Sequence, residues 1–127
     1  MARILVLEDE PTVLLVLSEV LQDEGHEVVT ADNGFEGLDW LDRSPPPDLM
    51  LLDLFMPGIG GRALLQRIRP DERFRDLPVV LITGAVQHDS DFPPPGSYQG
   101  MVRKPFDVEE VIAIVARLTQ GHQARPT

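Results

Sequence analysis

Short aliphatic runs alternate along this chain with segments in which apolar residues recur at helical spacing. The runs span Arg3–Leu7, His26–Ala31, Asp48–Phe55, Pro78–Thr83 and, more briefly, Gly100–Val102. Most end at acids, prolines or glycines. Aliphatic runs of this length, bounded by such residues, predict strands covered on both faces.

The segments between these runs have the 3.6-residue apolar periodicity of helices that pack on a sheet. The predicted helices span Pro11–Glu24, Phe35–Leu41, Gly61–Arg69 and Val108–Leu118. The core-facing side of the first comprises Val13, Val16, Leu17, Val20 and Leu21. Leu15 falls on the opposite side and is predicted to be exposed. In the second, Phe35, Leu38 and Leu41 share one face, and Trp40 beside it is predicted to be partly buried.

A further helix between the last two strands is disfavoured by composition. The segment Gln87–Tyr98 contains Pro93-Pro94-Pro95-Gly96. Prolines remove backbone donors and push the residues before them toward extended conformations. The sequence therefore predicts a degraded or irregular helix at this place.

Strands that alternate with helices predict a parallel sheet with right-handed crossovers and helices on both faces. We expect a doubly wound, five-stranded α/β domain over residues 1–119. Residues 120–127 (QGHQARPT) are predicted to be a C-terminal tail or the start of a linker.

Composition narrows the possible functions. The 127 residues suit a single domain, and 43% hydrophobic with 25% charged residues is typical of a soluble globular protein. A formal net charge of −10 disfavours direct binding of nucleic acid. The apolar runs are too short to span a membrane, and no secretory signal is visible. The absence of cysteine fits a cytoplasmic protein.

Polar residues that could take part in catalysis or metal binding lie at the ends of the predicted strands. Glu8 and Asp9 follow the first strand, Asp53 ends the apolar part of the third, and Thr83 ends the fourth. Lys104, the only lysine of the chain, follows the fifth. Because ligands collect at the carboxyl ends of parallel strands, these side chains are predicted to converge.

Three converging carboxylates either take up protons or surround a hard cation. Mg²⁺ fits, since it binds through one or two carboxylates and keeps positions for water and phosphate. An aspartate can act as a nucleophile and form an aspartyl phosphate if the charge on the phosphoryl oxygens is neutralised. Asp53 is the candidate nucleophile, and Mg²⁺, Lys104 and Thr83 would share the neutralisation.

Four segments in order, LVLEDE, LMLLDLFMPGIGG, VVLITG and VRKPF, resemble the signatures of bacterial response-regulator receiver domains of the chemotaxis-regulator type. The resemblance implies a flavodoxin-like fold with strand order 2-1-3-4-5. It also implies transfer of a phosphoryl group from a phosphohistidine, on a sensor histidine kinase or a histidine phosphotransfer protein, to Asp53. Such a domain is a phospho-acceptor that promotes its own phosphorylation and acts on a downstream output protein or domain.

The resemblance also assigns individual roles. Mg²⁺ would be bound by Glu8, Asp9, Asp53 and the backbone carbonyl of Phe55. Thr83 and Lys104 would contact the phosphoryl group. Glu8 replaces the aspartate more usual at the first acidic position.

Three further positions depart from the family's pattern and predict altered behaviour. Phe55 and Ala85 occupy positions that often orient or admit the attacking water, which predicts slow self-dephosphorylation. Met101 stands where the family commonly carries a switching aromatic residue, so Thr83 and Met101 form the predicted switch. We expect Gln87–Tyr98 to be irregular and mobile, and to become ordered when Thr83 moves toward the phosphate.

Other functions are less well supported. A haloacid-dehalogenase-like phosphatase would carry a second acid where Phe55 stands, and a flavodoxin-like FMN protein would not carry Glu8-Asp9-Glu10 after its first strand. A pseudo-receiver that acts only as a protein-interaction module remains the alternative.

Overall fold

One five-stranded parallel sheet forms the centre of the computed structural model, which describes residues 2–84 and 92–123. The strands are β1 (Arg3–Leu7), β2 (Glu27–Ala31), β3 (Leu49–Asp53), β4 (Val79–Thr83) and β5 (Gly100–Arg103). Their order is β2-β1-β3-β4-β5, and every neighbouring pair is parallel. The doubly wound sheet and its 2-1-3-4-5 order are therefore confirmed.

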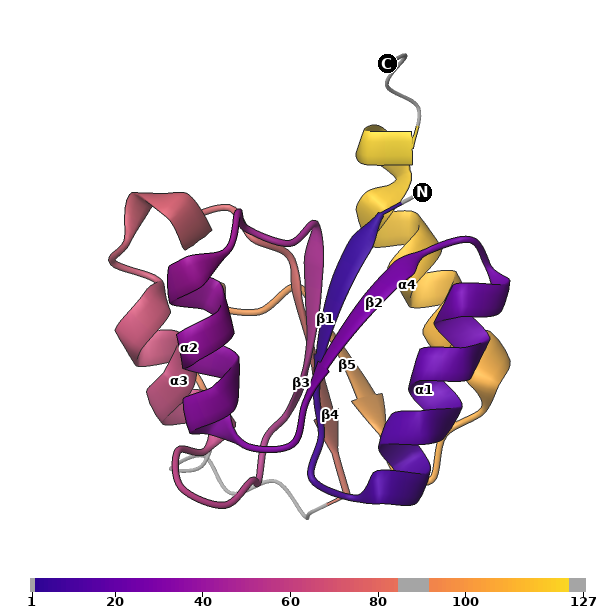
Figure 1. Ribbon diagram of the computed structural model, residues 1–127, viewed down its shortest axis with the longest axis horizontal. Coiled ribbons are helices and arrows are strands. Elements are labelled where there is room, and N and C mark those ends of the chain that lie inside the picture. The colour runs from indigo at the N-terminus through magenta and orange to yellow at the C-terminus, as the bar shows by residue number, and fades with distance from the viewer. Residues whose placement is uncertain (1, 85–91, 124–127) are drawn as a thin grey trace.

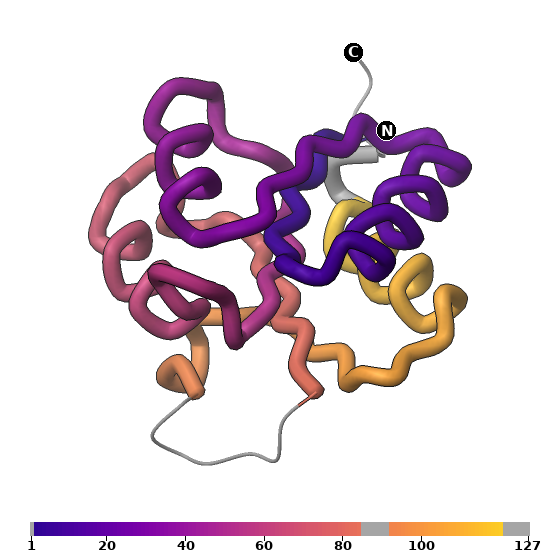
Figure 2. The backbone as a smooth tube through the Cα atoms, turned by 60° about the horizontal axis from the view of Figure 1, so that its bottom comes forward, coloured from indigo at the N-terminus to yellow at the C-terminus, as the bar shows by residue number. Residues whose placement is uncertain are grey.

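Helices cover both faces of this sheet. The described residues form α1 (Pro11–Asp23), α2 (Gly34–Arg43), α3 (Gly61–Ile68), the short 3₁₀ helix η1 (Glu72–Phe74) and α4 (Val108–Gln123). Figure 1 shows α2, α3 and η1 on one face of the sheet and α1 with α4 on the other. Figure 2 shows the same two layers from below, with the central strands between them. None of the helices in residues 2–84 and 92–123 has the length and apolarity needed to cross a bilayer.

The sheet separates two apolar cores, because successive strand side chains point to opposite faces. Leu5 and Leu7 of β1 belong to the core beneath α2 and α3, whereas Ile4 and Val6 belong to the core beneath α1 and α4. All five residues of β3 are buried. The central strand thus has no solvent-facing side, and a charged group placed on it is removed from water.

The helix ends differ in detail from those predicted. Asn33 caps α2 by accepting a hydrogen bond from the Glu36 amide at 2.8 Å, so this helix begins at Gly34. At the other end of the chain α4 continues past the predicted end at Leu118 as far as Gln123. Residues 120–123 are therefore helical, while residues 124–127 lie outside the described part and the domain boundary at residue 119 stays a prediction.

Two apolar residues assigned to the core are exposed. Val16 of α1 is 37% exposed and Phe35 of α2 is 58% exposed, so both assignments were wrong. Phe35 lies in the first turn of its helix, and its ring covers the backbone of Gly58, whose φ of +82° favours glycine. Leu15 is exposed and Trp40 is partly buried, as predicted.

The segment before β5 has no helix in its described part, residues 92–99, as expected from its prolines. Phe92 and Tyr98 pack against the core beneath α2 and α3. Residues 85–91, which contain the start of the predicted irregular segment, lie outside the described residues.

Arg69, directly after α3, ties this segment to the rest of the domain. Its guanidinium donates to the carbonyl oxygens of Phe74 at 2.7 Å, Leu77 at 2.8 Å and Ser97 at 3.0 Å. The η1 turn, the entry to β4 and the approach to β5 all meet at this one side chain. Hydrogen bonds from this one side chain thus hold the non-helical segment before β5 in place.

Arg69→Met should therefore lower the free energy of unfolding by about 2–4 kcal/mol, because three carbonyl groups lose charge-assisted donors. Urea unfolding followed by circular dichroism measures this change. Arg67→Met, at an exposed position of the same helix, is the matched control and should change stability by less than about 0.5 kcal/mol. Equal effects of the two substitutions would contradict the role given to Arg69.

Candidate functional site

The carboxyl ends of four strands bring the predicted site residues to one edge of the sheet. Asp53 is the last residue of β3 and Thr83 the last of β4, while Glu8 and Lys104 directly follow β1 and β5. This edge is the lower one in Figure 1. The Lys104 amide donates to the Thr83 carbonyl at 2.9 Å, which extends the pairing of β4 and β5 into the site.

The three predicted metal-binding carboxylates form a cluster. Glu8, Asp9 and Asp53 each offer an oxygen, and these oxygens all lie within 4.8 Å of one another. Glu8 is 0% exposed and Asp53 is 4% exposed, whereas Asp9 faces solvent. Two of the three charges are thus removed from water, where an uncompensated carboxylate is costly.

Lys104 supplies the positive charge of the site. Its Nζ lies 2.9 Å from Oε1 of Glu8, 3.0 Å from Oε1 of Glu10 and 3.5 Å from Oδ2 of Asp53. Burial disfavours the charged ammonium, but its close contacts with the carboxylates of Glu8 and Glu10 outweigh this and raise the pKa of Lys104. Glu10 was not predicted as a site residue, although it follows Glu8 and Asp9 in the sequence.

Asp53 is held in an environment that disfavours its ionisation. Burial, and next the nearby charge of Glu8, raise the pKa of Asp53 to about 7 from an ordinary 3.8. The Phe55 amide, which donates to Oδ1 at 3.2 Å, and the Lys104 ammonium act in the opposite direction without overcoming it. The site therefore holds more negative charge than the protein's own groups neutralise.

The excess of negative charge at the site suits a hard divalent cation. Four carboxylates, those of Glu8, Asp9, Glu10 and Asp53, face one ammonium group. Oε1 of Glu8 is fully buried and receives no aligned hydrogen bond from the described residues, so the Lys104 charge is its partner. An oxygen-rich set of this kind suits Mg²⁺. The carbonyl of Phe55 stays a predicted ligand, since the contact seen here is made by its amide.

The two predicted switch residues lie on neighbouring strands. Thr83 is 1% exposed at the end of β4. Met101 pairs with Leu81 in the β4–β5 ladder and packs, partly buried, against the core beneath α2 and α3. Ala85, predicted to affect the access of water, lies outside the described residues.

An apolar groove adjoins the site on the α1 side. It has a volume of about 480 Å³ and lies between α1 and the loop from β5 to α4. Its lining includes Val13, Val16, Gly84, Lys104, Pro105 and Phe106. This groove was not predicted, because the spacing of Val16 had indicated a core residue. The amphipathic pattern alone cannot distinguish a residue at the edge of a helix's buried face from one inside it.

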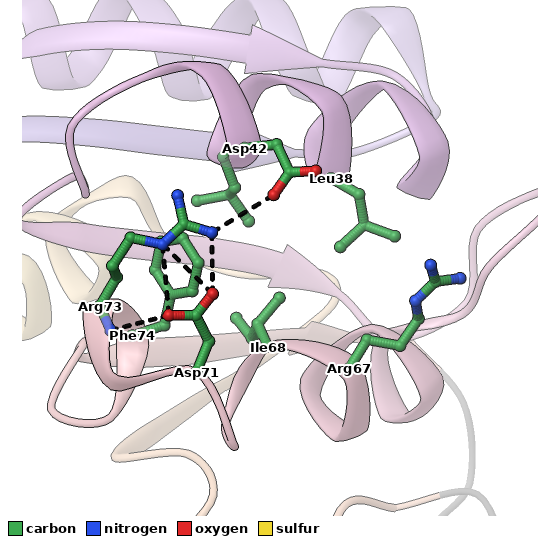
Figure 3. Close-up of a pocket in the computed structure, with 8 residues that line it drawn as sticks. Leu38, Asp42, Arg67, Ile68, Asp71, Arg73 and Phe74 are labelled. Carbon is green, nitrogen blue, oxygen red and sulfur yellow. Dashed lines mark hydrogen bonds and ion pairs between the residues drawn. The ribbon is translucent and has the colours of Figure 1, made fainter.

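A second hollow lies at the opposite end of the sheet and shares no residue with the acidic cluster. It measures about 130 Å³ between α2, α3 and η1 (Figure 3). Arg73 spans it, donating to Asp71 at 2.8 Å and to Asp42 at 3.3 Å, and its guanidinium lies over the Phe74 ring. These ion pairs join η1 to α2, so we interpret the charged groups around this hollow as structural.

Comparison with known proteins agrees with the geometry. The family model described as the response regulator receiver domain matches residues 4–116. The RpaA regulator of Synechocystis, described as a DNA-binding dual master transcriptional regulator, is 38% identical over 120 residues. That match covers 93% of this chain and 49% of RpaA, so the chain spans about half of that relative. Protein PilH of Pseudomonas aeruginosa is 32% identical, with 95% of this chain and 100% of PilH covered.

A solved structure shows the same likeness. The response regulator TrrA of Thermotoga maritima, crystallised in complex with Mg²⁺ and BeF, superimposes with a TM-score of 0.81 at 36% identity. The match covers 93% of this chain and 99% of TrrA.

The raised pKa of Asp53 predicts that Asp53→Asn increases the free energy of unfolding, by an amount that depends on pH, when a chelator is present. Between about pH 4 and pH 7 the folded protein binds a proton at Asp53 that the unfolded chain does not, so this residue's contribution to stability falls as pH rises. Above pH 7 the charged form destabilises the fold. At pH 8 the asparagine variant should be more stable by about 1–3 kcal/mol, and near pH 4 the gain should vanish.

Urea unfolding at several pH values measures this difference. Glu19→Gln, which removes an exposed charge from α1, is the matched control and should show no such trend. A destabilised asparagine variant at pH 8 would show that Asp53 is better compensated than its surroundings indicate.

Proposed function

The chain belongs to the family of response regulator receiver domains of two-component systems, and we propose that it accepts a phosphoryl group on Asp53 and changes conformation in response. One observation carries the proposal. A buried carboxylate at the end of the central strand lies 3.5 Å from the only lysine of the chain, inside a cluster of further carboxylates. Burial of several charges costs stability, and such perturbed clusters are typical of functional sites.

Mg²⁺ is the proposed cofactor. Glu8, Asp9, Asp53 and the carbonyl of Phe55 would hold it, and when bound it neutralises charge on the carboxylates and on the phosphoryl oxygens. The TrrA complex with Mg²⁺ and BeF supports this assignment by homology. The longer side chain of Glu8 replaces the usual aspartate, which we expect to change the affinity for the cation and not the ability to bind it.

The proposed reaction is an in-line displacement. A carboxylate oxygen of Asp53 attacks the phosphorus of a phosphohistidine, the P–N bond breaks, and its electron pair returns to the imidazole, which is thereby restored. The product is an acyl phosphate on Asp53. The Lys104 ammonium and the Thr83 hydroxyl would donate to the phosphoryl oxygens. Asp53 must be ionised to attack, and a bound cation would favour the ionised form by lowering the raised pKa of this carboxyl.

Because the chain belongs to the receiver-domain family, the proposed phosphodonor is a sensor histidine kinase or a histidine phosphotransfer protein. The groove between α1 and the β5–α4 loop supports docking on this side, because it is apolar and is lined by Lys104 itself. Leu15, 58% exposed, adds apolar surface to the same helix. The cytoplasm is the expected compartment, since receiver domains meet their kinases there.

The proposed response passes through Thr83 and Met101 to an output protein or domain. Thr83 would move toward the phosphoryl group, and Met101, a flexible side chain on the neighbouring strand, would repack in place of the usual aromatic ring. Catalysis is limited to the domain's own phosphorylation and slow dephosphorylation. Direct binding of nucleic acid is not proposed for this chain, because its net charge of −10 opposes it.

Incubation with acetyl phosphate and Mg²⁺ should add one phosphoryl mass to the wild-type protein, because acetyl phosphate replaces phosphohistidine as donor. Intact mass spectrometry measures the product. The addition should disappear with a chelator and in Asp53→Asn. An unaltered mass in a folded wild-type sample would favour the alternative, a pseudo-receiver that acts only as an interaction module.

The phosphoryl lifetime should depend on residue 55. Phe55 has no group that can orient the attacking water, so Phe55→Asn should shorten the lifetime several-fold while Phe55→Leu leaves it long. Decay of the phosphorylated mass after removal of the donor measures both. A lifetime that is unchanged or longer in Phe55→Asn would refute the role assigned to this position.

A further inference from the structure

Glu10 makes a contact that neither the sequence pattern nor the proposed reaction requires. Its Oε1 lies 3.0 Å from Nζ of Lys104, 94 residues away in the sequence. Glu10 is also the residue that precedes the first turn of α1, yet its side chain makes no capping hydrogen bond to that helix. Glutamate is not among the residues preferred for capping at this position, so its side chain is available for the contact with Lys104.

Carboxylates surround the ammonium group of Lys104, and hydrogen bonds to Glu10 and Asp53 take up two of its three donors. An ammonium group has three N–H bonds, and three carboxylates lie within 3.5 Å of Nζ. A phosphoryl group on Asp53 takes the place of that carboxylate as a neighbour of Nζ and extends beyond it, so we expect the ammonium to shift away from Glu8 or Glu10 when it contacts the phosphoryl oxygens. The question is which carboxylate yields.

Glu8 is poorly suited to yield. It is 0% exposed, so loss of the ammonium would leave its Oε1 buried without a charge partner. Its other oxygen, Oε2, accepts from the Glu10 amide at 3.0 Å, which fixes the side chain. The carboxylate of Glu10 is 61% exposed and can be hydrated by water when it releases the lysine.

We propose that Glu10 is a positioning residue that holds the Lys104 ammonium in the unphosphorylated protein and releases it when a phosphoryl group occupies Asp53. This inference rests on the proposed function. Its consequence is that Glu10 competes with the phosphoryl group for the lysine. The strength of this one ion pair then sets how readily the domain enters its phosphorylated conformation.

Beryllofluoride, which occupies the place of a phosphoryl group on aspartate, provides the test. At saturating Mg²⁺, Glu10→Gln should bind beryllofluoride about 2- to 10-fold more tightly than wild type, as expected for removal of a partly exposed competing ion pair. Glu10→Asp keeps the charge and shortens the side chain. It should show tightening similar to that of Glu10→Gln if direct contact with Lys104 is what matters.

A double-mutant cycle separates contact from long-range charge effects. In a Lys104→Met background, Glu10→Gln should leave the affinity unchanged, because no ammonium remains to be released. The same tightening in both backgrounds would overturn the proposal, as would unchanged affinity of Glu10→Gln in the presence of Lys104. Circular dichroism of the variants checks that each is folded.

The single lysine allows a second measurement that does not depend on phosphorylation. Lysine labelled with ¹³C and ¹⁵N gives one ε-ammonium signal, which should shift on Glu10→Gln in the free protein and converge with wild type on addition of beryllofluoride. An unmoved signal in the free protein would overturn the contact itself. Failure of wild type to bind beryllofluoride at all would instead overturn the proposed function, together with the release step that rests on it.

Discussion

The charge balance between Lys104 and the carboxylates around it is the constraint on which this edge of the molecule depends. Glu8 and Asp53 are almost completely buried, and burial of an unpaired carboxylate is strongly unfavourable. One ammonium within 3.5 Å of both reduces the cost without removing it, and the pKa of Asp53 stays near 7. A site left in this condition responds to added positive charge, which is the property that a cation-dependent phospho-acceptor needs.

The fold creates this balance through its topology. In a parallel sheet of order β2-β1-β3-β4-β5 the carboxyl ends of β1, β3, β4 and β5 all meet at one edge, so residues as distant as Glu8 and Lys104 become neighbours. The central position of β3 removes Asp53 from water on both faces. The same sheet that supplies the stabilising apolar cores therefore also supplies the destabilised carboxylate.

Much of this arrangement could be predicted from the sequence. Continuous aliphatic runs located the strands, and the acids, threonine and lysine at their ends located the edge where chemistry occurs. The strand order came from the family resemblance, because local pattern cannot say which strands are neighbours. The irregular conformation predicted for Gln87–Tyr98 is found in the described part, residues 92–99, since prolines act through local geometry.

The errors concern features that depend on tertiary packing. Val16 and Phe35 have the spacing of core residues, but helix docking leaves both at the margin of the buried surface. The contact made by Glu10 could not be predicted either, because its partner Lys104 is 94 residues away in the sequence. Sequence periodicity defines which side of a helix is apolar, whereas the extent of coverage is set by neighbours distant in the chain.

The positions of Thr83 and Lys104 give the site a short route to the rest of the molecule. Their strands are adjacent, and the Lys104 amide donates to the Thr83 carbonyl, so displacement of one backbone is transmitted to the other. β5 pairs only with β4 in the described sheet and is therefore less constrained than β3, which is held on both sides. Met101, on β5, packs against the core beneath α2 and α3 and not against the groove beside α1. A change at the proposed phosphoryl site is thus expected to reach the core on the side opposite to the proposed docking groove, which would leave the proposed donor and output partner on different surfaces.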